Sequence, residues 1–458
     1  MNKLRLTAVI VAGLLSGCAS KIDEQQYQLD LQSFVEKTQI AQQLQGTDEL
    51  NWWQQLGSQQ LNDLVAKARS NNFDLKTRQF ELQSALARLG AERAQYLPQG
   101  NIGASATRTS TDNSQSRESQ SGVNLDWQID LFGKVTALVD AANAGAMSQA
   151  EQVRALQIET LSSVVKGFVS YQGNLQKKQI INLQIAALLQ SIDVLKARVE
   201  EGVASELDLN RTMAQLKQQQ ALLPEIEFAQ FSDLSMLALL TGQLASDIKL
   251  QSERDILNRN FTVSLTSPSK AVALRPDISR ALFEFSQASS LSVAASKALL
   301  PDISLTAFAG VISLGNNQLS DTQQQWQLMP QIQWSLLSYP ALLAQRDAQQ
   351  YLTKAAYSQY QQVVLNAMSE SELSLQRLVK QSEQSMYANE RFKYANNAFL
   401  QAQAMYQEGQ IPYLELLDAR QDVLIAQENA VDSTISSLLA KVETYQVFNG
   451  RWGYALVN

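Results

Sequence analysis

Two stretches of the chain decide its fold: KARVEEGVASELDLN at residues 196–210 and QAMYQEGQIPYLELL at residues 403–417. Each has a glycine between two long runs in which apolar residues recur at helical spacing. Because glycine adopts the left-handed conformation that often ends a helix, each stretch predicts the tip of a helical hairpin. We expect one end of the molecule to be formed by the tip residues Gly202, Val203, Ala204, Ser205 and Gly409.

The chain is an internal duplication, since its halves match when it is shifted on itself by about 203–208 positions. Glu201-Gly202 falls on Glu408-Gly409, and Tyr96-Leu97-Pro98 falls on Leu299-Leu300-Pro301. Each half predicts a helix, two strands, a long helix, a glycine tip and a returning helix. A repeat of this length indicates duplication of a whole structural unit.

The repeat sets the predicted boundaries. The first unit covers residues 51–242, with strands near 101–110 and 122–131, a long helix near 134–200 and a helix near 206–240. The second unit covers residues 271–452, with strands near 302–312 and 325–336, a long helix near 341–408 and a helix near 413–448. Between them, the polar residues 243–270 predict a linker at the waist of the molecule, and residues 453–458 predict a C-terminal tail.

The long helices are the largest predicted elements. Residues 134–199 and 341–407 contain no proline, and about 66 helical residues span roughly 100 Å. Within each half, the two shorter helices are expected to stack end to end beside the long one. Helices of this length with a narrow apolar stripe need neighbours that cover the stripe.

The strands alternate apolar and polar residues. Strands of about ten residues with one apolar and one polar face are typical of a membrane barrel with a wet interior. The side chains expected to face that interior are Asn124, Asp126, Gln128, Asp130, Gln331 and Gln333. The residues Thr109–Gln120 between the first two strands have the composition of a hairpin loop. The alternative is a soluble sheet covered by helices, but the adjoining helices, rich in Gln, Ala and Ser, offer little apolar surface.

Four strands cannot close a barrel, and an open edge in lipid leaves backbone groups without hydrogen bonds. Two chains would give eight strands with a filled interior, and three would give twelve strands around a lumen. The sequence therefore predicts a fold that is mainly α with a membrane β-barrel. It predicts a homotrimer whose twelve-strand barrel continues into a long α-helical tube.

The N-terminus has the pattern of a lipoprotein signal. Lys3 and Arg5 precede a short apolar run that ends in Leu15-Ser16-Gly17-Cys18, a pattern similar to the bacterial lipobox. We expect residues 1–17 to be a signal peptide, Cys18 to carry lipid and residues 18–50 to be an extended arm. The alternative is an ordinary signal peptide with a chance cysteine. No later apolar run of 18 residues is apparent, so no transmembrane helix is expected.

Composition limits the chemistry of the chain. Its net charge of -7 makes nucleic acid an unsuitable partner. With no histidine and a single cysteine among 458 residues, His-based catalysis and His or Cys metal sites are missing. We expect no catalytic residue, cofactor or metal. Asp126 and Asp130 lie four residues apart on a predicted strand. The distance between them is therefore more than about 12 Å, which is too far for paired acid–base catalysis.

An ordered set of motifs along the chain resembles the outer membrane factor family, the TolC/NodT-like lipoprotein exit ducts of tripartite efflux systems. The motifs include Trp52-Trp53, the run from Trp127 to Gly133, Leu239 to Gly242, Leu274 to Ile278 and Gly450-Arg451-Trp452. The resemblance implies a trimer that spans the outer membrane, with its helices in the periplasm. It implies a periplasmic adaptor that links the duct to an inner-membrane pump of the resistance-nodulation-division type, exporting drugs or other small toxic compounds.

The same resemblance places acidic residues, here Glu415 and Asp418, at the periplasmic constriction. Three apart on a helix, they share a face, and a ring of six carboxylates would favour cations. The alternative is that both are solvated surface residues. The resemblance also implies that the tips dock the adaptor, although a plain helical turn would need Gly202 equally. Two other functions stay open: a non-conducting envelope scaffold, or the same duct serving metal-ion efflux or type I protein secretion.

Overall fold

The computed structural model describes residues 51–111, 114–253, 256–259, 261–263, 272, 274–314 and 322–448. The signal peptide, Cys18, the arm at residues 18–50 and the tail at 453–458 lie outside the described residues. Their assignments therefore stay predictions.

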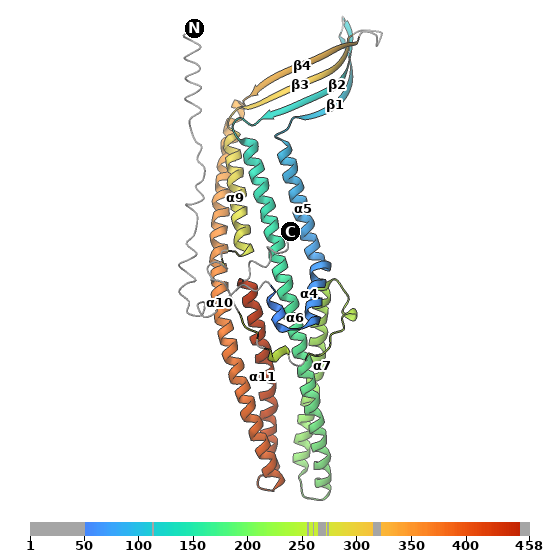
Figure 1. The fold of residues 1–458 in the computed structure, drawn as a ribbon, viewed down its shortest axis with the longest axis vertical. Helices are drawn as coiled ribbons and strands as arrows, with labels where there is room; N and C mark the ends of the chain where they lie inside the picture. Colours follow the sequence, from blue (N-terminus) through green and yellow to red (C-terminus); the bar gives the residue numbers. More distant parts are fainter. Residues whose placement is uncertain are drawn as a thin grey trace.

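The two halves of the chain have the same order of elements (Figure 1). The first half comprises α5 (Phe73–Ala94), β1 (Gln99–Thr111), β2 (Ser114–Ile129), α6 (Lys134–Glu200) and α7 (Glu206–Thr241). The second half comprises α9 (Pro276–Lys297), β3 (Asp302–Leu314), β4 (Thr322–Gln333), α10 (Tyr339–Gln407) and α11 (Tyr413–Phe448). Lengths match closely: α5 and α9 each have 22 residues, α7 and α11 each have 36, and α6 and α10 have 67 and 69.

The long helices α6 and α10 each run along most of the length of the molecule (Figure 1). Along α6, helix α5 covers the part nearer the sheet and α7 covers the part nearer the tips; α9 and α11 do the same along α10. Helix α9 also packs against α6, and α11 packs against α6, so the two halves form one body. The sheet lies at one end of this helical column and both hairpin tips lie at the other (Figure 1).

The four strands form one antiparallel sheet in the order β1-β2-β3-β4, so β1 and β4 are its edges. The expected loop at 109–120 is wrong, because β1 continues to Thr111 and β2 already begins at Ser114. The polar Ser- and Thr-rich residues here form ladder pairs such as Ser105 with Gln120. Thr has a high strand propensity, and the backbone hydrogen bonds of the ladder do not require apolar side chains.

The sheet is attached to the helices in the same way in both halves. The indole N–H of Trp127 donates a hydrogen bond to the carbonyl of Tyr96 at 3.0 Å, and that of Trp334 donates to the carbonyl of Leu299 at 3.1 Å. Tyr96 and Leu299 are matching residues at the ends of α5 and α9. These paired hydrogen bonds hold the roots of β2 and β4 against the helices that precede each hairpin.

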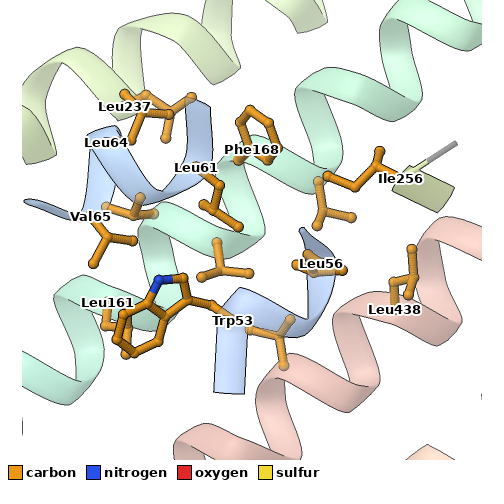
Figure 2. Close-up of a cluster of buried hydrophobic side chains, with 14 of the residues drawn as sticks. Trp53, Leu56, Leu61, Leu64, Val65, Leu161, Phe168, Leu237, Ile256 and Leu438 are labelled. Carbon is orange, nitrogen blue, oxygen red and sulfur yellow. The ribbon is translucent and has the colours of Figure 1, made fainter. Parts of the chain in front are cut away.

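The main apolar core lies where the first half, the linker and α11 meet. Figure 2 shows it built from the short helices η2 (Trp52–Leu56) and α4 (Gln59–Asn71) packed on α6, α7 and α11. At its centre Trp52 stacks on Tyr445, with ring centroids 4.8 Å apart and planes 5° from parallel. The linker also contributes, because Ile256 and Phe261 are fully buried in this cluster. The linker is thus anchored by these side chains despite its polar composition.

Helix α6 departs from the expectation that no segment after the signal peptide is long and apolar enough to cross a membrane as a helix. It contains an 18-residue window with a mean hydropathy of 1.3, which by length and composition could cross a membrane. Only 28% of that window is buried within the chain, although α6 packs against α5, α7, α9 and α11.

Candidate functional site

Both hairpin tips are closed by a glycine in the left-handed conformation. Gly202 has φ 76° and Gly409 has φ 72°. Beyond each glycine, a backbone N–H returns to the preceding helix: Val203 to Arg198 at 2.9 Å and Gln410 to Met405 at 2.8 Å. A Cβ on either glycine would meet no atom within 4 Å. Lack of space is therefore not the reason for glycine at these positions. Glycine is favoured because it adopts the left-handed backbone conformation without strain.

The first tip presents an apolar side chain beside a helix cap. Val203 is 68% exposed at the end of the hairpin. Ser205 caps α7, since its hydroxyl oxygen accepts a hydrogen bond from the N–H of Asp208 at 3.2 Å. Gly202 and Ser205 thus stabilise the turn, and Val203 is free to contact another molecule.

The two hairpins are joined close to their tips by a hydroxyl pair. The side-chain oxygens of Thr212, in α7, and Tyr413, in α11, lie 2.9 Å apart. Thr212 is fully buried and donates its own proton to the carbonyl of Asp208 at 2.8 Å, so Tyr413 is the donor between them. Burial raises the pKa of Tyr413 above its ordinary value, which keeps the phenol protonated and able to donate.

A second contact joins the same hairpins. The guanidinium of Arg198, at the end of α6, donates to the hydroxyl of Tyr406 and lies 5.3 Å from the centre of its ring. The rings of Tyr406 and Tyr413 meet edge to face with centroids 5.4 Å apart. We call Arg198, Thr212, Tyr406 and Tyr413 the hairpin latch. Sequence reasoning missed it, although two tyrosines on either side of Gly409 were a visible signal.

The structure places Glu415 and Asp418 on an exposed face of α11, one turn after the second tip. Within the described part of the chain, neither carboxylate has an ion-pair partner. The nearby cation Arg420 faces the helices instead, where it donates to the hydroxyl of Ser191 in α6 at 2.6 Å and lies over the ring of Phe399 in α10 at 5.5 Å. The two carboxylates are therefore directed away from the body of the chain.

The strand register brings five of the six predicted lumen residues to one face of the sheet. Asp126 pairs with Thr306, Gln128 pairs with Ser304, and Ser304 pairs with Gln331. The remaining members of this face, Asn124 and Gln333, follow from the two-residue period of the strands. Hydrogen bonds tie the face together: the hydroxyl of Thr306 donates to Asp126 and the amide of Gln128 donates to Asp302, both at 3.1 Å.

The prediction that Asp130 faces the barrel interior is wrong. Strand β2 ends at Ile129, and the side chain of Asp130 turns to the start of α6. Its carboxylate accepts hydrogen bonds from the backbone N–H of Val135 at 2.9 Å, and from the N–H and hydroxyl of Thr136 at 2.8 and 2.7 Å. Partial burial opposes ionisation, but these hydrogen bonds outweigh it and lower the pKa of Asp130. Asp130 is a helix cap, satisfying donors that begin a helix and have no partner within it.

No cluster of three or more carboxylate or cysteine side chains with metal-binding geometry occurs among the residues that the structure describes. The chemical features of the described chain are therefore a polar sheet face, an acidic pair beside a hairpin tip and a latch between hairpins.

The profile of the family described as "Outer membrane efflux protein" matches residues 64–243 and 267–449, the two repeats. Among curated proteins, the toluene efflux pump outer membrane protein TtgF of Pseudomonas putida is 25% identical over 88% of this chain and 86% of its own length. The probable outer membrane lipoprotein SilC of Salmonella typhimurium is 23% identical over 99% of this chain and all of its own.

Solved structures share the fold. The outer-membrane channel OprN superposes with a TM-score of 0.84 at 22% identity, covering 93% of this chain and 97% of that chain. The Campylobacter jejuni CmeC outer membrane channel superposes with a TM-score of 0.78 at 21% identity, covering 89% of each chain. With the repeat, the open-edged sheet and the helical column in place, this chain belongs to the outer membrane efflux protein family, whose members are ducts rather than enzymes.

Proposed function

We propose that three copies of this chain form a continuous duct from the periplasm to the cell exterior, lipidated at Cys18. The observation that carries the proposal is the sheet with two unpaired edges, β1 and β4, and faces of opposite polarity. In lipid those edges must pair, and β1 of one copy against β4 of the next satisfies them in a closed ring. Twelve strands then surround a lumen lined by the polar face.

At the opposite end, the acidic pair narrows the periplasmic mouth. A three-fold axis near α11 would gather three copies of Glu415 and Asp418 into one acidic ring. Such a ring attracts cations, and mutual repulsion between its carboxylates is relieved by bound cations or protons. The hairpin latch holds α11 in place beside α7 and so keeps the mouth closed at rest.

The tips dock a periplasmic adaptor, which connects the duct to an inner-membrane pump of the resistance-nodulation-division type. The exposed Val203, together with Ala204, Ser205 and the Gly409 turn, offers the apolar contact for it. Relatives are named for the efflux of toluene, antibiotics, solvents and cations. We assign drugs or other small toxic compounds to this duct, since the relatives named for toluene, antibiotic and solvent efflux support that class.

Assembly tests this proposal directly. The chain purified in detergent is expected to give the mass of three copies by native mass spectrometry, unchanged on dilution, because one copy leaves its strand edges unpaired and two copies would close a barrel without a lumen. A stable monomer or dimer would contradict the duct and favour an envelope scaffold.

A further inference from the structure

Two arginines lie directly opposite each other on neighbouring strands. Arg108 of β1 pairs with Arg117 of β2 in the ladder, and both are exposed. Directly opposed side chains have Cβ atoms about 5 Å apart, close enough for both guanidinium groups to reach one anion.

This pair continues the apolar face of the sheet. On that face Leu125 pairs with Ala307, and Val123 pairs with both Ile102 and Ala309. Each further step of two residues along β2 stays on the same side and passes Ser121 and Ser119 before it reaches Arg117. The acidic neighbour Glu118 pairs with Thr107 and is therefore directed to the other face.

The distance along the strand puts the pair at the edge of the lipid. Ile129, where β2 ends beside the helices, is twelve residues from Arg117, or about 40 Å along the strand. With the usual tilt of barrel strands this is a height of about 30 Å, against an apolar band of about 25 Å. Arg108 and Arg117 thus lie just beyond the hydrocarbon, on the side away from the helical column.

The neighbours leave room for a large headgroup. Between the arginine pair and the apolar rows lies the pair formed by Ala106 and Ser119, whose side chains are small. Arginine binds phosphate with two parallel hydrogen bonds, and a pair of arginines offers two such contacts.

We propose that Arg108 and Arg117 together bind a phosphate of a lipid headgroup in the outer leaflet of the membrane. The inference rests on the proposed trimeric barrel, which turns this face to lipid. Three such sites would surround the trimer, one on each copy, and would attach its rim to phosphorylated outer-leaflet lipid.

The test is native mass spectrometry of the detergent-solubilised trimer titrated with lipid A, which has two phosphates, and with its fully dephosphorylated form. The variant is Arg108→Gln/Arg117→Gln. The control is Arg88→Gln/Arg391→Gln, which removes the same charge from exposed positions on α5 and α10. The natural trimer and the control are expected to prefer the phosphorylated lipid by about tenfold or more, and the variant to lose that preference.

Two results would overturn the inference. One is a variant that prefers the phosphorylated lipid as strongly as the control does. The other is displacement of lipid A by millimolar inorganic phosphate alone, which would make this a site for free anions. Conductance in a planar bilayer separates the lipid site from the proposed duct. If the natural protein forms a conducting trimer but shows no preference for the phosphorylated lipid, only the lipid site is contradicted. If the chain never forms trimers, both the duct and the lipid site are contradicted.

Discussion

Replacing Val203 by glutamate is expected to abolish efflux-dependent resistance while the trimer still forms. Val203 is 68% exposed at the first tip, so a carboxylate there is solvated and leaves the fold intact. In the docked complex the same carboxylate would be buried against an apolar partner surface, and an unpaired buried charge is costly. The measurement is the inhibitory concentration of a toxic compound for cells that depend on this duct, expected to fall to that of cells without it.

Two matched variants at the same tip separate docking from folding. Val203→Ala keeps the surface apolar and is expected to retain most of the resistance. Ser205→Ala removes the cap of α7 and costs about 1 kcal/mol of stability, with resistance preserved. If Val203→Glu instead dissociates the trimer, the tip is structural; if it preserves full resistance, the adaptor docks elsewhere.

Removing the hydroxyl pair of the hairpin latch is expected to enlarge the resting conductance several-fold. In the double variant Thr212→Val/Tyr413→Phe both hydroxyl groups are lost together, so no buried donor is left without a partner and stability changes little. The single variant Thr212→Val leaves the hydroxyl of Tyr413 without its acceptor and costs about 1–3 kcal/mol, whereas Tyr413→Phe leaves Thr212 still donating to the carbonyl of Asp208. Single-channel recording in a planar bilayer measures the opening directly.

The control for this variant is Ser374→Ala/Thr444→Val, which removes a buried hydroxyl pair at 3.3 Å between α10 and α11, within one half of the repeat. Its conductance should equal that of the natural protein. Alkaline pH provides an independent check: because burial raises the pKa of Tyr413, the latch is fully present below the phenol's ordinary pKa and is lost as pH rises through the higher, folded value. Equal conductance of latch variant and control would contradict a gating role.

The sequence predicted the large elements well because their signals are local or repeated. Gly202 and Gly409 indicated the tips through backbone conformation alone, and both have a positive φ. Two proline-free stretches predicted the long helices, which begin at Lys134 and Tyr339. Alternation of polar and apolar residues predicted the two faces of the sheet, which the register bears out for Asp126 and its neighbours.

The parts that could not be predicted depend on contacts between distant segments or on where a strand stops. The hairpin latch joins residues about 200 apart in the chain, and no local pattern marks Thr212 as the partner of Tyr413. Asp130 continued the alternation of β2, but the start of α6 offered its carboxylate unpaired N–H groups. The polar composition of residues 109–120 suggested a loop, whereas hydrogen bonding between the strands continues through most of them.

The central claim is a conducting duct with an acidic periplasmic mouth, and single-channel recording of the purified trimer beside Glu415→Ala/Asp418→Ala tests it most directly. We expect a small, cation-selective conductance from the natural protein. The variant should conduct more and lose its selectivity, because the acidic ring has been removed. Cation selectivity that is unchanged in the variant, or the absence of any conductance from intact trimers of both proteins, would contradict the account.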